Sequence, residues 1–303
     1  MPNWNDVLKE IDTARINYTH QAHSAIDEVR RSYLEKLHNK TGRNIIAYYS
    51  AFLSKPNIAQ TIISDEDKNG FMMAIHNLDR EKGLDLILHT QGGDIAATES
   101  IANYLHKMFG DNIRAIVPQI AMSAGTMLAC SCQSILMGKQ SNLGPIDPHL
   151  GGIPAHGVVA EFKRANEEIK ADPNKAILWA QIISKYHPTF LGQCENAIKW
   201  ASSFVEEQLK TIMFKNDQDK DSKAKEITDK LSDFHDNKTH SRHIHAEECK
   251  KLGLNIIDIE PDQELQDLIL TVHHCYMHSL TNTASCKIIE NNHGIAFVKQ
   301  QIS

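Results

Sequence analysis

Two apolar runs in this chain end in turns of very small residues, and this pattern constrains the fold more than any other feature. The run "LDLILHT" (84–90) is followed by "QGGD" and then by a segment with helical periodicity. The run "IRAIVPQI" (113–120) is followed by "AMSAGT" and a second helical segment. A continuous apolar run is typical of a strand buried on both faces. Strands that alternate with helices form parallel sheets with right-handed crossovers, so the sequence predicts an α/β fold.

The flanking segments extend this pattern in both directions. Residues 4 to about 40 have mostly helical periodicity, which predicts one long amphipathic helix, and "NIIAYYSAF" (44–52) predicts another strand. From 154 to about 236 the pattern turns helical and polar, and we interpret it as an insertion. A helix ended by Gly253, a strand and a last helix follow, and the tail from Thr283 has weak character. The expected parts are an N-terminal helix (1–41), an α/β domain (42–262) that contains the insertion, and a C-terminal helix and tail (263–303).

A long uncharged segment raises the alternative of a membrane protein. The residues between Arg114 and Lys139 carry no charge, and their number is sufficient to span a bilayer. Pro118, Gln119 and several hydroxyl side chains interrupt the segment, so buried strands and a helix explain it better. We therefore expect no membrane span.

The bulk composition argues against other classes of function. The formal net charge is -6 and no basic face dominates, so nucleic-acid binding is not expected. The first residues, "MPNWNDVLKEIDTARINY", are charged throughout and lack the apolar core of a signal peptide. The cysteines are scattered and do not form paired metal-binding motifs, which favours free thiols in a reducing compartment. We expect a cytoplasmic protein.

The two small-residue turns are the segments best suited to chemistry. Gly92 and Gly93 follow a strand, and their N–H groups can point at a developing oxyanion beside a helix N-terminus. Ser123 precedes a helix, where backbone N–H groups and the helix dipole support negative charge. Taken alone, the glycines fit a tight turn and the serine fits a helix N-cap. Because neighbouring parallel strands carry them, the pair instead predicts oxyanion donors and a nucleophile at one site.

Several segments resemble the Clp protease/crotonase superfold and, within it, the serine dehydrogenase proteinase family, a relative of signal peptide peptidase A. The main ones are "LILHTQGGDIAATESIANYL", "AIVPQIAMSAGTMLACSCQSILMGKQSNLGPIDP" and "HAEECKKLGLNIID"; "TGRNIIAYYS" and "VHHCYMHSL" extend the resemblance over roughly 25–295. It implies a Clp/crotonase-like spiral of ββα units, here with a long N-terminal helix and added helices. It also implies a homo-oligomeric ring or barrel, serine peptidase chemistry on peptide or protein substrates, and no cofactor.

The same resemblance implies roles for individual residues. Ser123 corresponds to the nucleophile, and the N–H groups of Gly92, Gly93 and Ala124 correspond to the oxyanion donors. The general base is left open. At the place of the Clp triad histidine, "GPIDP" offers Asp147 and no histidine in register.

Histidines and lysines compete for the role of base. His149 comes two or three positions after the expected place, whereas His240, in "THSRHIHAEEC", lies close to the third triad position of the Clp family. A Ser–Asp–His arrangement with Asp147 and His240 satisfies triad logic, because triads are defined by geometry and not by chain order.

Signal peptide peptidase relatives use a lysine, and "DPNKAI" offers Lys175 at the corresponding place, with Lys139 and Lys163 as competitors. A lysine can act as a base if burial lowers its pKa. A metal site is not expected, because His274 and His278 have a usable zinc spacing but no evident third ligand.

Three hypotheses follow from these observations. The first is a serine endopeptidase that works inside an oligomeric chamber and depends on the Ser123 hydroxyl. The second is a crotonase-like acyl-CoA enzyme, which uses the oxyanion donors without a serine nucleophile. The third is a catalytically inactive scaffold that keeps the fold for assembly.

Overall fold

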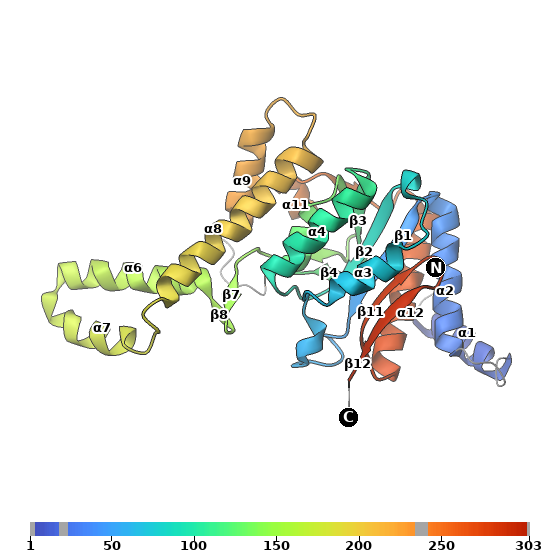
Figure 1. The fold of residues 1–303 in the computed structure, drawn as a ribbon, viewed down its shortest axis with the longest axis horizontal. Coiled ribbons are helices and arrows are strands. Elements are labelled where there is room, and N and C mark those ends of the chain that lie inside the picture. Colours follow the sequence, from blue (N-terminus) through green and yellow to red (C-terminus); the bar gives the residue numbers. More distant parts are fainter. Residues whose placement is uncertain (1–3, 18–23, 234–241, 302–303) are drawn as a thin grey trace.

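The computed structural model describes residues 4–17, 24–233 and 242–301 of the 303-residue chain. Its centre is a sheet of seven strands in the order β10-β5-β3-β2-β1-β11-β12 (Figure 1). In that order the strands are Ile256–Asp258, Ser134–Met137, Ile113–Val117, Leu84–His89, Asn44–Ser50, Ser285–Asn291 and Ala296–Gln300. Strands β10, β5, β3, β2 and β1 are mutually parallel, as the alternation of strands and helices predicts.

Helices cover both faces of this sheet. Alternate residues of β1 belong to different cores, with Tyr48 buried on one face and Tyr49 on the other. The first face is covered by α3 (Asp67–Ile75), α4 (Ile95–Phe109), α5 (Ala124–Cys130) and α8 (Phe190–Gln208). The second face is covered by α1 (Trp4–Asn17), α2 (Ala25–Thr41) and α12 (Gln263–Asn282). Burial on both faces explains the continuous apolar run of β2.

The N-terminal segment differs from the single long helix that its periodicity predicts. Ser24 is extended, with φ -68° and ψ 136°, and α2 begins at the next residue. Helix α1 packs against α2, so the two form a helical pair and not one continuous rod. Both pack on α12, which brings the two terminal regions of the chain together (Figure 1).

The C-terminal tail also differs from its prediction, because it forms the hairpin β11–β12. Strand β11 pairs antiparallel with β1 and lies between it and the edge strand β12. Lys287 and Glu290 lie within β11 and are fully buried. Lys287 is neutralised by Asp67 and Glu290 by Arg30, and both partners are distant in sequence. Because the local sequence shows the charges but not their partners, its pattern does not predict a buried strand here.

The segment predicted as a helical insertion is helical, and part of it projects as an arm (Figure 1). The arm consists of α6 (Ala155–Ala171), a short 3₁₀ turn (Pro173–Lys175) and α7 (Ala176–Ile183). Helix α8 returns from the arm to the body, and a π-helical turn (Leu209–Met213) and α9 (Lys220–Ser232) follow it.

Short strands complete the fold beside the main sheet. Strands β4 (Ile120–Ala121), β6 (Asn142–Leu143) and β9 (Ile244–His245) form a small sheet, and α11 (Ala246–Leu252) follows β9. Strands β7 (His149–Leu150) and β8 (Ile153–Pro154) form a hairpin before the arm. Two 3₁₀ turns, Ala59–Thr61 and Arg80–Lys82, connect the first strands and helices.

The uncharged segment from 115 to 138 is accounted for by this architecture. It contains the end of β3, then β4, α5 and β5, and most of its residues are buried in the core. Within the described residues, no helix combines the length and the apolar character that crossing a bilayer requires.

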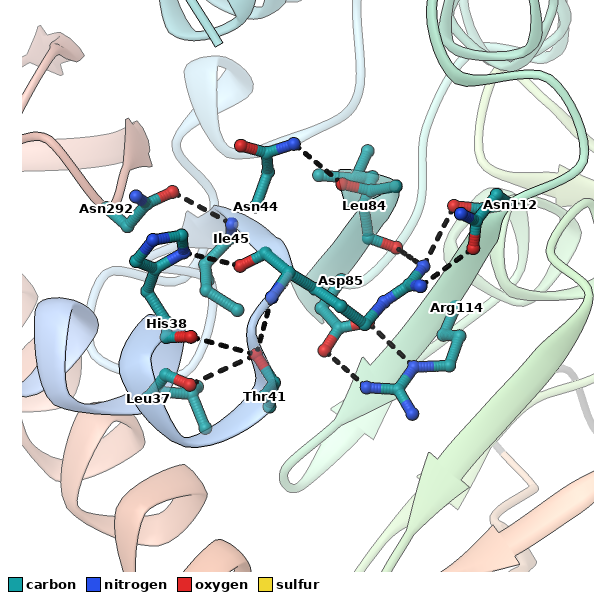
Figure 2. Close-up of polar contacts among 12 residues, drawn as sticks. Leu37, His38, Thr41, Asn44, Ile45, Leu84, Asp85, Asn112, Arg114 and Asn292 are labelled. Atoms are coloured by element: carbon teal, nitrogen blue, oxygen red, sulfur yellow. Dashed lines mark hydrogen bonds and ion pairs between the residues drawn. The ribbon is translucent and has the colours of Figure 1, made fainter. Parts of the chain in front are cut away.

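A polar network fastens the amino ends of β1 and β2 (Figure 2). Asp85 is fully buried and accepts bonds from Arg43 Nε at 2.6 Å and from both Arg114 Nε at 2.8 Å and Nη2 at 2.6 Å. The Arg43 guanidinium also reaches the side chain and carbonyl of Asn112. This end of the sheet is therefore closed by ion pairs, and the two small-residue turns lie at the opposite, carboxyl end.

Candidate active site

The structure brings the two small-residue turns side by side. Thr90, which directly follows β2, bridges to Ala121 of β4: its N–H donates to Ile120 O at 3.2 Å, and Met122 N–H donates to its carbonyl at 3.0 Å. The first turn then enters α4, whose N-terminus is capped by the side chain of Asp94. The second turn enters α5 through Ser123.

Ser123 has an unusual backbone conformation at this turn. Its φ is 51° and its ψ is -115°, on the side of the map that residues with a side chain rarely occupy. Its hydroxyl does not cap α5 and has no hydrogen-bond partner among the described residues, so the N-cap alternative is excluded. Strained backbone that displays a serine between a strand and a helix is the geometry of a nucleophile elbow. The side chain is partly exposed.

Gly92 packs directly against this serine. A Cβ atom added to Gly92 would lie 2.8 Å from Ser123 Cβ and 2.9 Å from the nitrogen of Ala124. Gly92 also has φ +99°, which favours glycine. Its N–H donates to Thr90 Oγ1 at 3.1 Å, so this amide is engaged within the protein. The close packing and the positive φ explain why this position requires glycine. The bond to Thr90 uses one of the three amides that were expected to act as oxyanion donors.

The amides of Gly93 and Ala124 are not engaged in this way. Neither N–H group has an acceptor within the part of the chain that the structure describes. Ala124 is the first residue of α5, so its amide belongs to the open N-terminus of that helix. Two amides, one on the glycine turn and one directly after Ser123, are therefore available to a ligand oxygen.

Backbone contacts hold Gly93 from its other side. Ile63 N–H donates to Gly92 O at 2.9 Å, and Asp94 N–H donates to Ile63 O at 3.0 Å. A Cβ atom at Gly93 would lie 2.3 Å from Ile63 N, so only glycine fits between these bonds. The first turn is thus clamped between the serine turn and the segment that contains Ile63.

A cleft of about 890 Å³ opens at Ser123. Its walls are mainly apolar and include Phe52, Ile62, Met122 and Trp200. Ile62 and Trp200 are 41% and 44% exposed, which is high for side chains of their size and places apolar surface at the cleft. A cleft of this volume and character accommodates an apolar stretch of a larger ligand.

The predicted acid and base candidates fall in different places. Asp147 is 3% exposed, and Ile146 and Pro148 line the cleft on either side of it while Asp147 itself does not. Its Oδ1 accepts the N–H of His156 at 3.3 Å, its Oδ2 has no partner among the described residues, and burial raises its pKa to about 6. His149 lines the cleft, and partial desolvation lowers its pKa. His240 lies outside the described residues.

The three lysine candidates lie outside the Ser123 cleft. Lys175 sits on the 3₁₀ turn between α6 and α7 and pairs with Glu168 at 3.3 Å. These two helices form the arm that projects from the body (Figure 1). Lys163 lies along α6, and Lys139 lies beside Glu260, which accepts its backbone N–H. All three are exposed, and none belongs to the residues that line the cleft.

His243 is a cleft residue that the sequence interpretation did not single out. It directly precedes β9, and the register of the small sheet aligns Ala121 with Leu143 and Leu143 with Ile244. Strands β4 and β9 are therefore two positions apart in this sheet, about 10 Å, and Ser123 follows the first while His243 precedes the second; both residues line the cleft. The cluster of histidines in "THSRHIHAEEC" was the available signal, but only the small sheet selects His243.

His274 and His278 both lie on α12, as their spacing predicts. Within the residues that the structure describes, no group of three His, Cys, Asp or Glu side chains could hold an ion. His278 is buried in the helix face that packs on the sheet.

Comparisons with known proteins point to one family. A family model described as a ClpP-like SDH-type serine proteinase matches residues 16–283. The mostly parallel seven-stranded sheet with helices on both faces agrees with a ClpP-like α/β fold, and the match agrees with the motif resemblance.

Two relatives come from Methanocaldococcus jannaschii, and both are described as uncharacterized. The protein MJ0137 is 35% identical over 201 residues, which cover 66% of this chain and 63% of the relative. The protein MJ1495 is 31% identical over 194 residues, which cover 64% of this chain and 59% of the relative. The chain thus spans about three fifths of the length of the curated relatives it matches.

Proposed function

The chain belongs to the family of ClpP-like SDH-type serine proteinases, and from this we propose that it is a serine endopeptidase with Ser123 as its nucleophile. The observation that carries the proposal is the pair of unengaged amides, Gly93 N–H on the glycine turn and Ala124 N–H directly after the strained Ser123. Preorganised backbone donors of this kind stabilise the oxyanion of an acyl-transfer intermediate. An N-cap serine would use its hydroxyl on an amide of the first helical turn, whereas the Ser123 hydroxyl makes no such bond.

The proposed reaction proceeds in two steps. The Ser123 oxygen bonds to the scissile carbonyl carbon, its proton passes to a base, and the carbonyl oxygen becomes an oxyanion held by the two amides. The carbon–nitrogen bond then breaks, and the base returns the proton to the leaving amine. Water hydrolyses the resulting ester by the same route, which releases the second product and restores the serine.

We propose that the base is a histidine of the cleft, His149 or His243, because both share the cleft with Ser123. Asp147 is buried behind the cleft wall and is proposed to act through another group and not directly on the serine. Lys175 and His240 remain proposals of the sequence: Lys175 would have to serve a neighbouring subunit from the arm, and His240 lies outside the described residues.

The surface supports an oligomeric, peptide-cleaving protein. Helix α7 has the sequence "AILWAQII" and exposes Ile177 at 74% and Leu178 at 57%, whereas Trp179 is buried against the arm. Exposed apolar helix faces are typical of protein interfaces, so we propose that the arm packs against another subunit. The apolar cleft favours unfolded or apolar peptide segments as substrates. All six cysteines are free thiols, which supports a cytoplasmic location.

Labelling with a fluorophosphonate probe tests the nucleophile. Wild-type protein should be labelled and should cleave an unfolded protein substrate such as casein, and Ser123→Ala should lose both activities. Ser184→Ala, which removes an exposed serine of the arm, should retain both. Normal assembly without labelling or cleavage in wild type would favour the inactive scaffold. Acyl-CoA turnover that survives in Ser123→Ala would favour the crotonase-like enzyme.

Two further measurements test the base and the assembly. His149→Gln or His243→Gln should lower the labelling rate and remove its dependence on pH, whereas the same change at the other histidine should leave the pH profile in place. Light scattering should show an oligomer that dissociates in the double variant Ile177→Asp with Leu178→Asp. A monomeric wild type would contradict the chamber.

A further inference from the structure

A buried ion pair lies close behind the turn that carries Gly93. Lys287 of β11 and Asp67 of α3 are both fully buried, and Lys287 Nζ lies 2.7 and 2.8 Å from the two carboxylate oxygens. The third donor of the ammonium goes to the carbonyl of Ile62 at 2.6 Å. The three protons of the lysine are thus matched by three acceptors.

The carboxylate of Asp67 is equally well satisfied. Tyr48 Oη donates to its Oδ2 at 2.8 Å, and Ser64 N–H donates to the same atom at 3.0 Å. Burial lowers the pKa of Lys287, and the Asp67 carboxylate opposes that shift. Burying two charges costs desolvation free energy, and an apolar pair of similar volume often makes the folded state equally stable. Stability alone is therefore a weak reason for this arrangement.

The geometry gives the pair a more specific task. Ile62, whose carbonyl is held by Lys287, lines the cleft and is followed by Ile63. Ile63 is the residue whose N–H and carbonyl bond to the turn on both sides of Gly93. A neighbouring contact, Gln91 Nε2 to Thr61 Oγ1 at 2.8 Å, ties the same two segments together.

We propose that Lys287 and Asp67 are positioning residues that hold the Gly93 amide in place through the segment 61–63. The inference rests on the proposed function, because it assumes that this amide binds an oxyanion. The pair touches neither the serine nor the cleft surface. Its effect passes from the lysine to one carbonyl, and from the adjoining residue to the turn.

The sheet itself does not need Lys287 for its pairing. Strand β11 is held to β1 and β12 by backbone hydrogen bonds along its length. Replacement of the ion pair therefore releases the 61–63 segment while it leaves the ladder intact. The double variant Lys287→Met with Asp67→Asn leaves no unpaired buried charge, because both members of the pair become neutral. The asparagine oxygen can still accept hydrogen bonds from Tyr48 and Ser64.

The test compares this double variant with Arg114→Met, which removes one partner of the buried Asp85 at the opposite end of the sheet. We expect the double variant to lower kcat and the fluorophosphonate labelling rate by about 10- to 100-fold, since misplacing one oxyanion donor has costs of this order. KM should stay within about twofold, because the cleft surface keeps its side chains. Arg114→Met should label at the wild-type rate even if it lowers thermal stability equally.

The outcomes separate the two proposals. If wild type is not labelled at Ser123, the proposed function fails. If wild type is labelled and the double variant labels as fast as Arg114→Met, the positioning role is overturned. If the double variant does not fold, Thr61→Val decides, because it removes the Gln91 contact from the same segment: a several-fold lower labelling rate supports the role, and an unchanged rate refutes it.

Discussion

The buried carboxylate of Asp147 makes a quantitative prediction about stability. Its Oδ1 receives one long hydrogen bond, from the N–H of His156, and its Oδ2 receives none from the described residues. Burial raises its pKa from 3.8 to about 6, so ionisation is less favourable in the folded chain than in the unfolded one. A shift of about two pKa units corresponds to about 3 kcal/mol.

The sign follows from proton linkage. Between pH 3.8 and 6 the folded chain holds a proton on Asp147 that the unfolded chain has lost, so stability falls as pH rises through this window. Above pH 6 the cost is complete and constant. Asparagine resembles the protonated acid, so Asp147→Asn should gain up to about 3 kcal/mol over wild type at pH 7.5 relative to pH 4.

Urea unfolding of wild type and Asp147→Asn at several pH values between 4 and 8 measures this difference in the free energy of unfolding. The contributions of the other titrating groups are the same in both proteins and cancel in the difference. Asp65→Asn, which changes an exposed carboxylate, controls for the loss of charge. A pH-independent difference between wild type and Asp147→Asn would refute the reasoning and would mean that the carboxylate has a partner or is solvated. A stabilised variant that loses labelling would mark Asp147 as a residue kept for activity at a cost in stability.

Three further predictions concern the same end of the sheet. His89 is fully buried with neither ring nitrogen hydrogen-bonded within the described chain, and burial lowers its pKa to about 3. The free energy of unfolding should therefore fall by up to about 5 kcal/mol as pH drops from 6.5 to 3, because the unfolded chain takes up a proton that the folded chain does not. Urea unfolding should show a smaller loss in His89→Phe. Gly92→Ala should abolish labelling because its Cβ would press on Ser123, whereas Gly42→Ala, at a positive φ in open space, should cost about 1 kcal/mol in thermal unfolding and keep full labelling. Ser123→Gly should be more stable than Ser123→Ala by about 1 kcal/mol in thermal unfolding because glycine relieves the strain at φ 51°, and equal stabilities would contradict that strain.

Local pattern was sufficient for the core of the fold and for the two turns. The apolar run of β2 reads as a strand because both its faces are buried, and glycines 92 and 93 read as a turn because few other residues fit there. The same reasoning failed for β11. There Lys287 and Glu290 break the apolar pattern, and their neutralising partners lie more than 200 residues away in sequence.

What the sequence by itself determined is the α/β alternation and the serine turn beside a glycine turn, because these depend on residues that are neighbours in the chain. Which groups face the serine depended on the tertiary structure. His243 precedes a strand of the small sheet and lines the cleft, whereas Asp147 is buried and does not line it. Lys175 lies on the arm, outside the cleft. The setting of the Gly93 amide was also tertiary, since Ile63 bonds to the residues on both sides of it, whereas the bond from Gly92 N–H to Thr90 is local in sequence. A proton acceptor is defined by distance and desolvation in space, and neither quantity is encoded in the spacing of residues along the chain.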